Sequence, residues 1–308
     1  MSRLHTIDLR FRGIPEAVAS YIIETKAGPV VLETGPESTF PALESGLAGL
    51  GYTPRDVRHV LVTHIHLDHA GAAWRLAREG AVIHVHEFGA KHLIDPSRLL
   101  DSARRIYRER MEPLWGRVEP IDAARVNPLA DGDRLDLDGL AIDVLETPGH
   151  ARHHHAFVVT NDARRAVFTG DAAACFIRSA PTYISLPTPP PEFDRDAWLT
   201  TLGRLQALGA DRLYPTHFGE VADPSGHLDR VRHAIVEHVE RVRTLRTAGL
   251  DRAAMLVRYQ DWMIEESRRA GVPDRLGEFY VKSSLADMNL TGILRWMDQR
   301  ESPTPTRT

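Results

Sequence analysis

The heptapeptide Thr63-His64-Ile65-His66-Leu67-Asp68-His69 places four side chains that can bind a metal ion within six residues. It ends the apolar run 57–63, which has the composition of a buried strand. Alternate side chains of an extended chain point to the same side, so the rings of His64 and His66 are expected to project together. Such nitrogen and oxygen donors suit zinc, iron or manganese, and the sequence therefore predicts a metal site at the end of a strand.

The surrounding segments alternate between strand and helix patterns in both halves of the chain. Before the heptapeptide, strands are expected over 17–24 and 29–33 and a helix over 40–50; after it, a helix over 70–79 and a strand over 81–85. The second half predicts two hairpins, a helix, a short strand and a long helix: residues 134–146 around Asp138-Gly139, 155–169 around Asn161-Asp162, 196–208, 211–215 and 228–247. Repetition of this order favours an α/β fold of two packed sheets with helices outside.

Two helical segments stand outside this pattern. The arginine-rich insertion 95–120 carries Ile106, Tyr107, Met111 and Leu114 along one side, which either packs as core or closes over a site as a lid. Residues 250–300 are expected to form a C-terminal helical extension that caps the site or mediates a homodimer contact. The catalytic domain is then expected over 1–249, and the polar, proline-bearing tail 301–308 is expected to be disordered.

The composition narrows the class of protein. The 308 residues are 43% hydrophobic with a net charge of −4, which gives no long-range attraction to nucleic acid or to an anionic membrane. The single cysteine, Cys175, excludes an intramolecular disulfide framework. Neither an export signal nor a membrane-spanning apolar run is evident, so we expect a cytoplasmic enzyme that acts on a small molecule.

Three further segments end an apolar strand with a metal-binding residue. They are Pro148-Gly149-His150, Thr169-Gly170-Asp171 and Pro215-Thr216-His217. With the heptapeptide they supply seven ligands, more than one tetrahedral ion needs. Two ions that share one carboxylate fit the count, and such ions lie about 3.5–4 Å apart.

This combination of motifs resembles the metallo-β-lactamase superfamily, nearest its glyoxalase II-like and lactonase-like hydrolases. The resemblance covers roughly residues 15 to 240 and implies an αββα sandwich with the site at the sheet edges. It implies that His64, His66 and His150 hold one metal ion. It further implies that Asp68, His69 and His217 hold a second and that Asp171 bridges both. Zinc is the expected metal, although iron and manganese fit the same donors.

The resemblance also suggests roles around the ligands. Where the family commonly has an aspartate that orients the histidine loop, this chain reads Leu32-Glu33-Thr34-Gly35, and Glu33 is expected to serve instead. Asp68 is expected to orient the nucleophile or to take a proton. In the proline-bearing segment 178–191, Tyr183 either donates a hydrogen bond to a developing oxyanion or packs against the sandwich. Arg178 either binds an anionic substrate group or is solvated.

The leading interpretation is a dinuclear hydrolase in which a metal-bridging hydroxide attacks a small ester, lactone or thioester. One alternative is a phosphodiesterase that acts on nucleic acid or cyclic nucleotides, but acidic residues interleave its candidate basic cluster, residues 104–110. An iron-dependent redox protein on the same ligands is a second alternative, since donor chemistry does not exclude iron. Five other histidines are left out of the ligand set: His84, His86, His153, His154 and His155.

Overall fold

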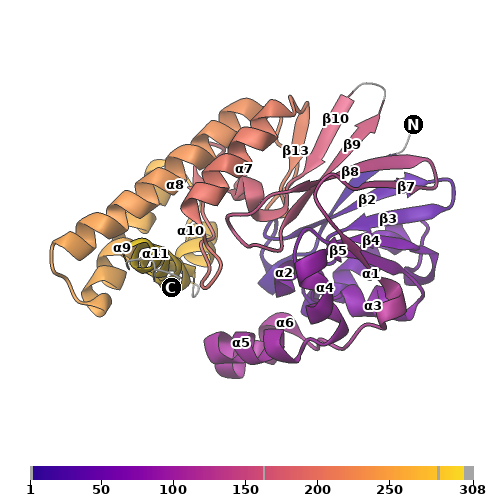
Figure 1. The fold of residues 1–308 in the computed structure, drawn as a ribbon, viewed down its shortest axis with the longest axis horizontal. Helices are drawn as coiled ribbons and strands as arrows, with labels where there is room; N and C mark the ends of the chain where they lie inside the picture. The colour runs from indigo at the N-terminus through magenta and orange to yellow at the C-terminus, as the bar shows by residue number, and fades with distance from the viewer. Residues whose placement is uncertain (1–2, 162–163, 283–284, 302–308) are drawn as a thin grey trace, which may run out of the picture.

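Two β-sheets pack face to face in the computed structural model, which describes residues 3–161, 164–282 and 285–301 (Figure 1). The first sheet has the order β1 (Leu4–Asp8), β2 (Ala19–Thr25), β3 (Gly28–Leu32), β4 (His59–Leu61), β5 (Val82–His86) and β6 (Val126–Leu129). The second has the order β13 (Arg212–Tyr214), β10 (Arg164–Phe168), β9 (His155–Asn161), β8 (Leu140–Glu146) and β7 (Arg134–Leu137). A separate pair joins β11 (Cys175–Phe176) to β12 (Ile184–Ser185).

Helices cover the outer faces of both sheets (Figure 1). The first sheet is covered by α1 (Phe40–Gly49), α2 (Leu67–Ala70), α3 (Ala73–Arg78) and α4 (Glu87–Ile94), and the second by α7 (Arg195–Ala207) and α8 (Pro224–Thr247). The remaining helices are α5 (Ser97–Tyr107), α6 (Met111–Trp115), α9 (Arg252–Arg269), α10 (Asp274–Gly277), the π-helical turn η7 (Glu278–Lys282) and α11 (Leu285–Glu301). The expected αββα sandwich with C-terminal helices is confirmed.

The alternation of side chains along β2 builds both layers of the core. Tyr21 faces the second sheet, where its ring centroid lies 5.3 Å from that of Phe168 and 5.5 Å from that of Tyr214. Its neighbour Ile22 belongs instead to the apolar cluster under α1 and α3. Complete burial of side chains of this size contributes about 1.5–3 kcal/mol each, so one strand stabilises two interfaces.

The strand directions bring the ends of distant strands to one place. β3 and β4 run parallel, so the residues after each strand meet at the same edge of the first sheet. In the second sheet β10 runs parallel to β13 and is antiparallel to β9, which is antiparallel to β8. The carboxyl ends of β8, β10 and β13 therefore share one edge, and that edge is where the candidate ligands follow.

The hairpin predicted at Asp138-Gly139 is confirmed, since both residues have positive φ, 56° and 86°, as a two-residue hairpin turn requires. The second predicted turn includes Asp162, which lies outside the described residues. The helix predicted over 70–79 is instead two short helices. α2 ends at Ala70 and α3 begins at Ala73, and between them the backbone N–H of Ala72 donates to Gly35 O at 3.0 Å instead of to a helical carbonyl. The described part of the chain has no helix long and apolar enough to span a membrane.

Two buried histidines of α8 are expected to make the free energy of unfolding fall at acid pH. Burial lowers the pKa of His227 to about 4 and that of His238 to about 3. In the unfolded chain both titrate near 6.5, so as the pH falls below that value the unfolded state binds more protons and stability is lost until the folded pKa is reached. We expect each histidine to cost about 1–2 kcal/mol of unfolding free energy at pH 5.

Urea denaturation of metal-free protein at pH 7.5 and pH 5 measures this loss. His238→Gln should shrink the difference between the two pH values, because one titrating group is removed. An unfolding free energy equal at both pH values would contradict the expectation.

Candidate metal centre

The seven predicted ligands lie together at the shared strand edges. The heptapeptide follows β4 and continues into α2, His150 follows β8, Asp171 follows β10 and His217 follows β13. Their donor atoms form three overlapping groups, within each of which all atoms lie within 4.8 Å of one another: His64, His66 and His150; His64, His69 and Asp171; Asp68, His69 and His217.

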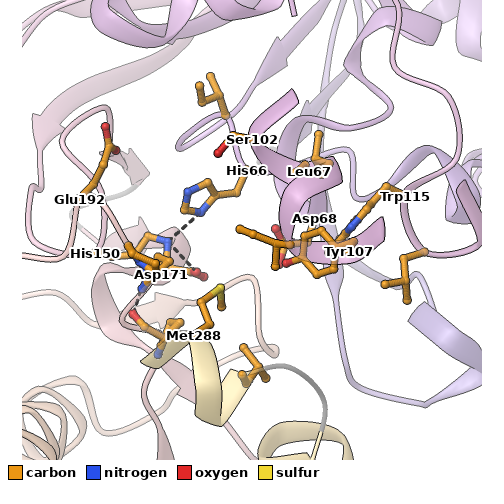
Figure 2. A pocket seen from close by; sticks show the side chains of 18 of the residues that line it. His66, Leu67, Asp68, Ser102, Tyr107, Trp115, His150, Asp171, Glu192 and Met288 are labelled. Atoms are coloured by element: carbon orange, nitrogen blue, oxygen red, sulfur yellow. Dashed lines mark hydrogen bonds and ion pairs between the residues drawn. The ribbon is translucent and has the colours of Figure 1, made fainter. Parts of the chain in front are cut away.

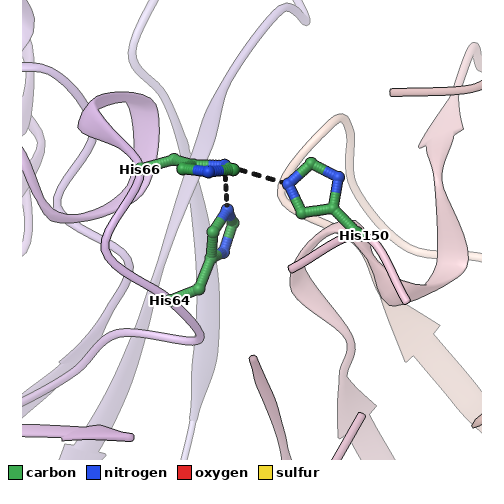
Figure 3. Close-up of side chains that lie close together, drawn as sticks. All are labelled: His64, His66 and His150. Atoms are coloured by element: carbon green, nitrogen blue, oxygen red, sulfur yellow. Dashed lines mark hydrogen bonds between the residues drawn. The ribbon is translucent and has the colours of Figure 1, made fainter. Parts of the chain in front are cut away.

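Three histidine rings converge in the first half of the centre (Figure 3). His66 Nδ1 lies 2.8 Å from His64 Nε2 and 2.9 Å from His150 Nε2. His150 Nδ1 donates to Pro187 O at 3.0 Å, so in the neutral ring Nε2 carries the lone pair that faces the other two rings. Burial lowers the pKa of all three rings, that of His66 to about 3, which keeps them neutral and able to bind a cation.

The second half mixes rings with carboxylates. His217 Nε2 lies 3.5 Å from Asp68 Oδ2 and 3.6 Å from Asp171 Oδ1. His217 Nδ1 donates to Ala17 O at 2.7 Å, so the neutral ring turns its lone pair toward two carboxylates. Burial lowers the pKa of His217 and of His69, but the acidic neighbours of each ring, Asp171 and Asp68 and for His69 also Glu33, together outweigh burial and raise it. A cation or a proton is thus required between these groups.

Asp171 joins the two halves. Its Oδ2 lies 3.3 Å from His150 Nε2, and its Oδ1 lies 3.3 Å from His69 Nε2. Oδ1 and His69 Nε2 are buried and have no hydrogen-bond partner. An uncompensated buried carboxylate costs several kcal/mol, so these residues fit the binding of a metal ion.

Comparison with known proteins agrees with this geometry. Residues 13–217 match the family described as the Metallo-beta-lactamase superfamily. The chain belongs to this superfamily. It is accordingly a metal-dependent hydrolase, as the combination of motifs predicts.

Individual relatives are distant. A metallo-beta-lactamase fold-containing protein of Sulfurisphaera tokodaii is 24% identical over 205 residues, covering 65% of this chain and 72% of the relative. An atrochrysone carboxyl ACP thioesterase of Aspergillus fumigatus is 25% identical over 235 residues, covering 73% of this chain and only 45% of the relative. A solved metallo-beta-lactamase family protein from Thermus thermophilus has a TM-score of 0.71 and 23% identity, covering 96% of this chain and 93% of that one, which shows the fold alone.

In this superfamily member a histidine outside the ligand set holds the Asp171 loop. The backbone N–H of Asp171 donates to His154 Nε2 at 3.1 Å, so His154 Nδ1 carries the proton that bonds Thr147 Oγ1 at 2.7 Å. Gly170, with φ +50°, leaves room for this contact, since a Cβ there would lie 2.8 Å from His154 Nε2. His154 is not among the expected metal ligands, and the sequence pattern did not predict this role for it.

Glu33 lies where the sequence predicts a group that orients the histidine loop. It is 2% exposed, its Oε1 accepts a hydrogen bond from Thr63 N at 3.2 Å, and its Oε2 lies 3.3 Å from His69 Nδ1. The longer glutamate side chain therefore spans from the end of β4 to a ligand ring.

A cavity of about 410 Å³ opens onto the centre (Figure 2). His66, Asp68, His150, Asp171 and His217 form its floor. Helices α5 and α6 line one side, the segment 185–192 another, and residues of η7 and α11 a third. The insertion thus contributes both to the core, where Trp115 stacks on Phe11 at 5.3 Å, and to the cavity wall.

A partly buried pair in this wall, His153 and Glu192, was not predicted from the sequence. His153 Nε2 lies 2.9 Å from Glu192 Oε2. Against the effect of burial, the hydrogen bond and charge of His153 lower the pKa of Glu192 to about 2. The wall therefore carries this carboxylate as an anion that is hydrogen-bonded to His153.

Tyr183 and Arg178, the two residues of segment 178–191 considered for substrate binding, do not line the cavity. Tyr183 is 8% exposed, belongs to the apolar core and is absent from the cavity wall. Arg178 pairs with Glu16 at 3.0 Å, also outside the wall. Burial of the apolar ring favours packing at Tyr183, the second of the two expected roles. A different tyrosine, Tyr107 of α5, lies in the wall near Asp68 (Figure 2).

Proposed function

We propose that this protein hydrolyses a small ester, lactone or thioester with a dinuclear metal centre, most readily of zinc. The observation that carries the proposal is the position of Asp171, whose two carboxylate oxygens face separate groups of donors. Two divalent ions bound there would supply a hydroxide near neutral pH and polarise the substrate oxygen. No serine or cysteine nucleophile is then required.

Asp68 is the ligand best placed to handle the attacking water. Its side chain is 25% exposed and lies in the cavity wall, unlike the fully buried His69. Burial opposes its ionisation, but His69 and His217 lower its pKa to about 2, so it is an anion at neutral pH. As an anion it can accept a hydrogen bond from the water and orient it toward the substrate.

The cavity wall supports a carbonyl substrate over a nucleic acid. Around the polar floor it is mainly apolar, with aliphatic and aromatic side chains from α5, α6 and α11, among them Leu99, Ile106, Leu114, Trp115 and Met288. Such a wall suits an acyl group better than a polyanion. The thioesterase name of the Aspergillus relative supports a thioester, although the match covers under half of that relative.

The test is a screen of the zinc-loaded protein against lactones, thioesters, aryl esters and phosphodiesters. We expect turnover of at least one carbonyl class, lost in Asp171→Asn. Turnover of bis-aryl phosphate with no carbonyl substrate accepted would replace the proposal by a phosphodiesterase.

We further propose that Tyr107 donates a hydrogen bond to the substrate oxygen. None of the described residues is a hydrogen-bond partner of its hydroxyl, and burial together with the charge of Asp68 raises its pKa well above the usual value, so it stays protonated. Tyr107→Phe should lower kcat about a hundredfold, the usual effect of one lost donor to a developing oxyanion.

Tyr183→Phe is the matched control, because it removes the same hydroxyl from a ring outside the cavity wall. Steady-state kinetics of both variants decide the matter. A slowed Tyr183→Phe beside an unaffected Tyr107→Phe would restore Tyr183 as the donor.

A further inference from the structure

Three arginines in the cavity wall have no acidic partner among the residues that the structure describes. They are Arg12 of the turn η1 (Phe11–Gly13), Arg98 of α5 and Arg110 of η4 (Arg108–Arg110). Within residues 3–161, 164–282 and 285–301, no ion pair or hydrogen bond to a carboxylate involves any of the three side chains. Elsewhere on α5, Arg104 is paired with Asp101 at 3.3 Å and lies outside the wall.

The acidic groups of the same wall are already engaged. Asp68 and Asp171 face the ligand histidines, and Glu192 is paired with His153. No carboxylate among the described lining residues is left to neutralise the arginines. The wall away from the metal ligands therefore carries a net positive charge in a protein whose overall net charge is −4.

Apolar side chains share the cavity wall with the arginines. Ile106 is 40% exposed although it is a large hydrophobic residue, and it lines the cavity with Leu99 and Leu114 of the same insertion. Arg12 lies over the ring of Phe279, with its guanidinium carbon 5.6 Å from the ring centroid, which holds one cation against this apolar surface. An occupant must match both an apolar wall and the solvent-exposed guanidinium groups of Arg12, Arg98 and Arg110.

We infer that the substrate is an amphipathic anion: an acyl ester or thioester whose aliphatic part lies against the insertion and whose phosphate or carboxylate group binds Arg12, Arg98 and Arg110. The inference rests on the proposed function and specifies its substrate class. Guanidinium groups bind both anions through paired hydrogen bonds, so either can satisfy the site. A nucleic acid is disfavoured, because three cations around an apolar chamber neutralise few phosphates.

The experiment compares three thioesters of similar acyl length with the zinc-loaded protein. The neutral one is the octanoyl thioester of N-acetylcysteamine. The second is the octanoyl thioester of 4′-phosphopantetheine, with phosphate on the thiol side, and the third is the suberyl monothioester of N-acetylcysteamine, with carboxylate on the acyl side. We expect kcat/KM for one anionic thioester to exceed that for the neutral one by about tenfold or more, mostly through KM.

Variants of the arginines test whether these residues cause the preference for the anionic thioester. Arg12→Gln, Arg98→Gln and Arg110→Gln, singly and combined, should remove the preference for the anion and leave the neutral thioester unaffected. Arg104→Gln is the matched control on α5 and should keep the preference. Raising the ionic strength should weaken the preference, because salt screens charges that solvent reaches.

The inference is overturned if kcat/KM is equal for the neutral and both anionic thioesters, or if the preference survives in the triple variant. In either case hydrolysis of the neutral thioester still supports the proposed function. If no thioester is hydrolysed, calorimetric titration of octyl phosphate and octanoate into the zinc-loaded protein separates the two claims. Binding lost in the triple variant supports the anion site without thioester hydrolysis. Absence of binding, or unchanged binding in the triple variant, overturns it. Tight binding of a short RNA instead would assign the arginines to a nucleic acid.

Discussion

Asp171→Asn is expected to lower turnover by more than about a hundredfold. Loss of a group that only supports a metal ligand costs up to about a hundredfold, and loss of a ligand itself should cost more. The substitution keeps the size of the side chain but removes the charge that faces both groups of donors. The metal content of the purified variant should fall along with turnover. Steady-state kinetics and elemental analysis of the same preparation measure both.

Asp143→Asn provides the control for this substitution. Asp143 lies on β8 with its side chain 57% exposed and paired with Arg134, and it is not one of the candidate ligands. Its variant should keep wild-type turnover and metal content. Wild-type turnover in Asp171→Asn would contradict the bridging position assigned to this carboxylate.

Removal of metal is expected to abolish turnover and to lower the melting temperature. The fold buries Asp171 and His69 with donor atoms that lack hydrogen-bond partners, so the metal-free protein retains the cost of burying these polar atoms. With free metal at a thousandfold excess over Kd, binding adds about 4 kcal/mol to the unfolding free energy.

Thermal denaturation before and after treatment with a chelator measures this contribution, and added zinc should restore both stability and turnover. Protein shown by elemental analysis to be free of metal, yet unchanged in melting temperature and turnover, would contradict a metal-dependent mechanism.

The grouping of the seven candidate ligands could be predicted because the sequence places each of them next to a recognisable strand end. Four donors are contiguous in the chain, so their proximity needs no knowledge of the fold. His150, Asp171 and His217 each follow an apolar run, and the parallel directions of β8, β10 and β13 bring those ends together.

The cavity wall could not be predicted in the same way, because it is assembled from segments far apart in sequence. Proximity to Asp171 along the chain suggested Tyr183 as a substrate-binding residue, but the ring of Tyr183 packs in the core. Tyr107 reaches the site from an insertion more than sixty residues before Asp171. No local pattern distinguishes a tyrosine that packs from one that lines a cavity.

The run His153-His154-His155 shows that the sequence does not predict the role of each single histidine. Alternation along a strand predicts opposite sides, and the three rings occupy three different environments. His153 lines the cavity, His154 holds the Asp171 loop, and His155 stacks on His86 at 4.3 Å. Only the tertiary partners of each ring decide among these roles.

The number of metal ions per active chain tests the central claim most directly. Metal-free protein is titrated with zinc while turnover and bound metal are measured together. We expect turnover to rise until two ions are bound per chain. Full turnover at a single bound ion, with no further gain from the second, would contradict a dinuclear centre bridged by Asp171.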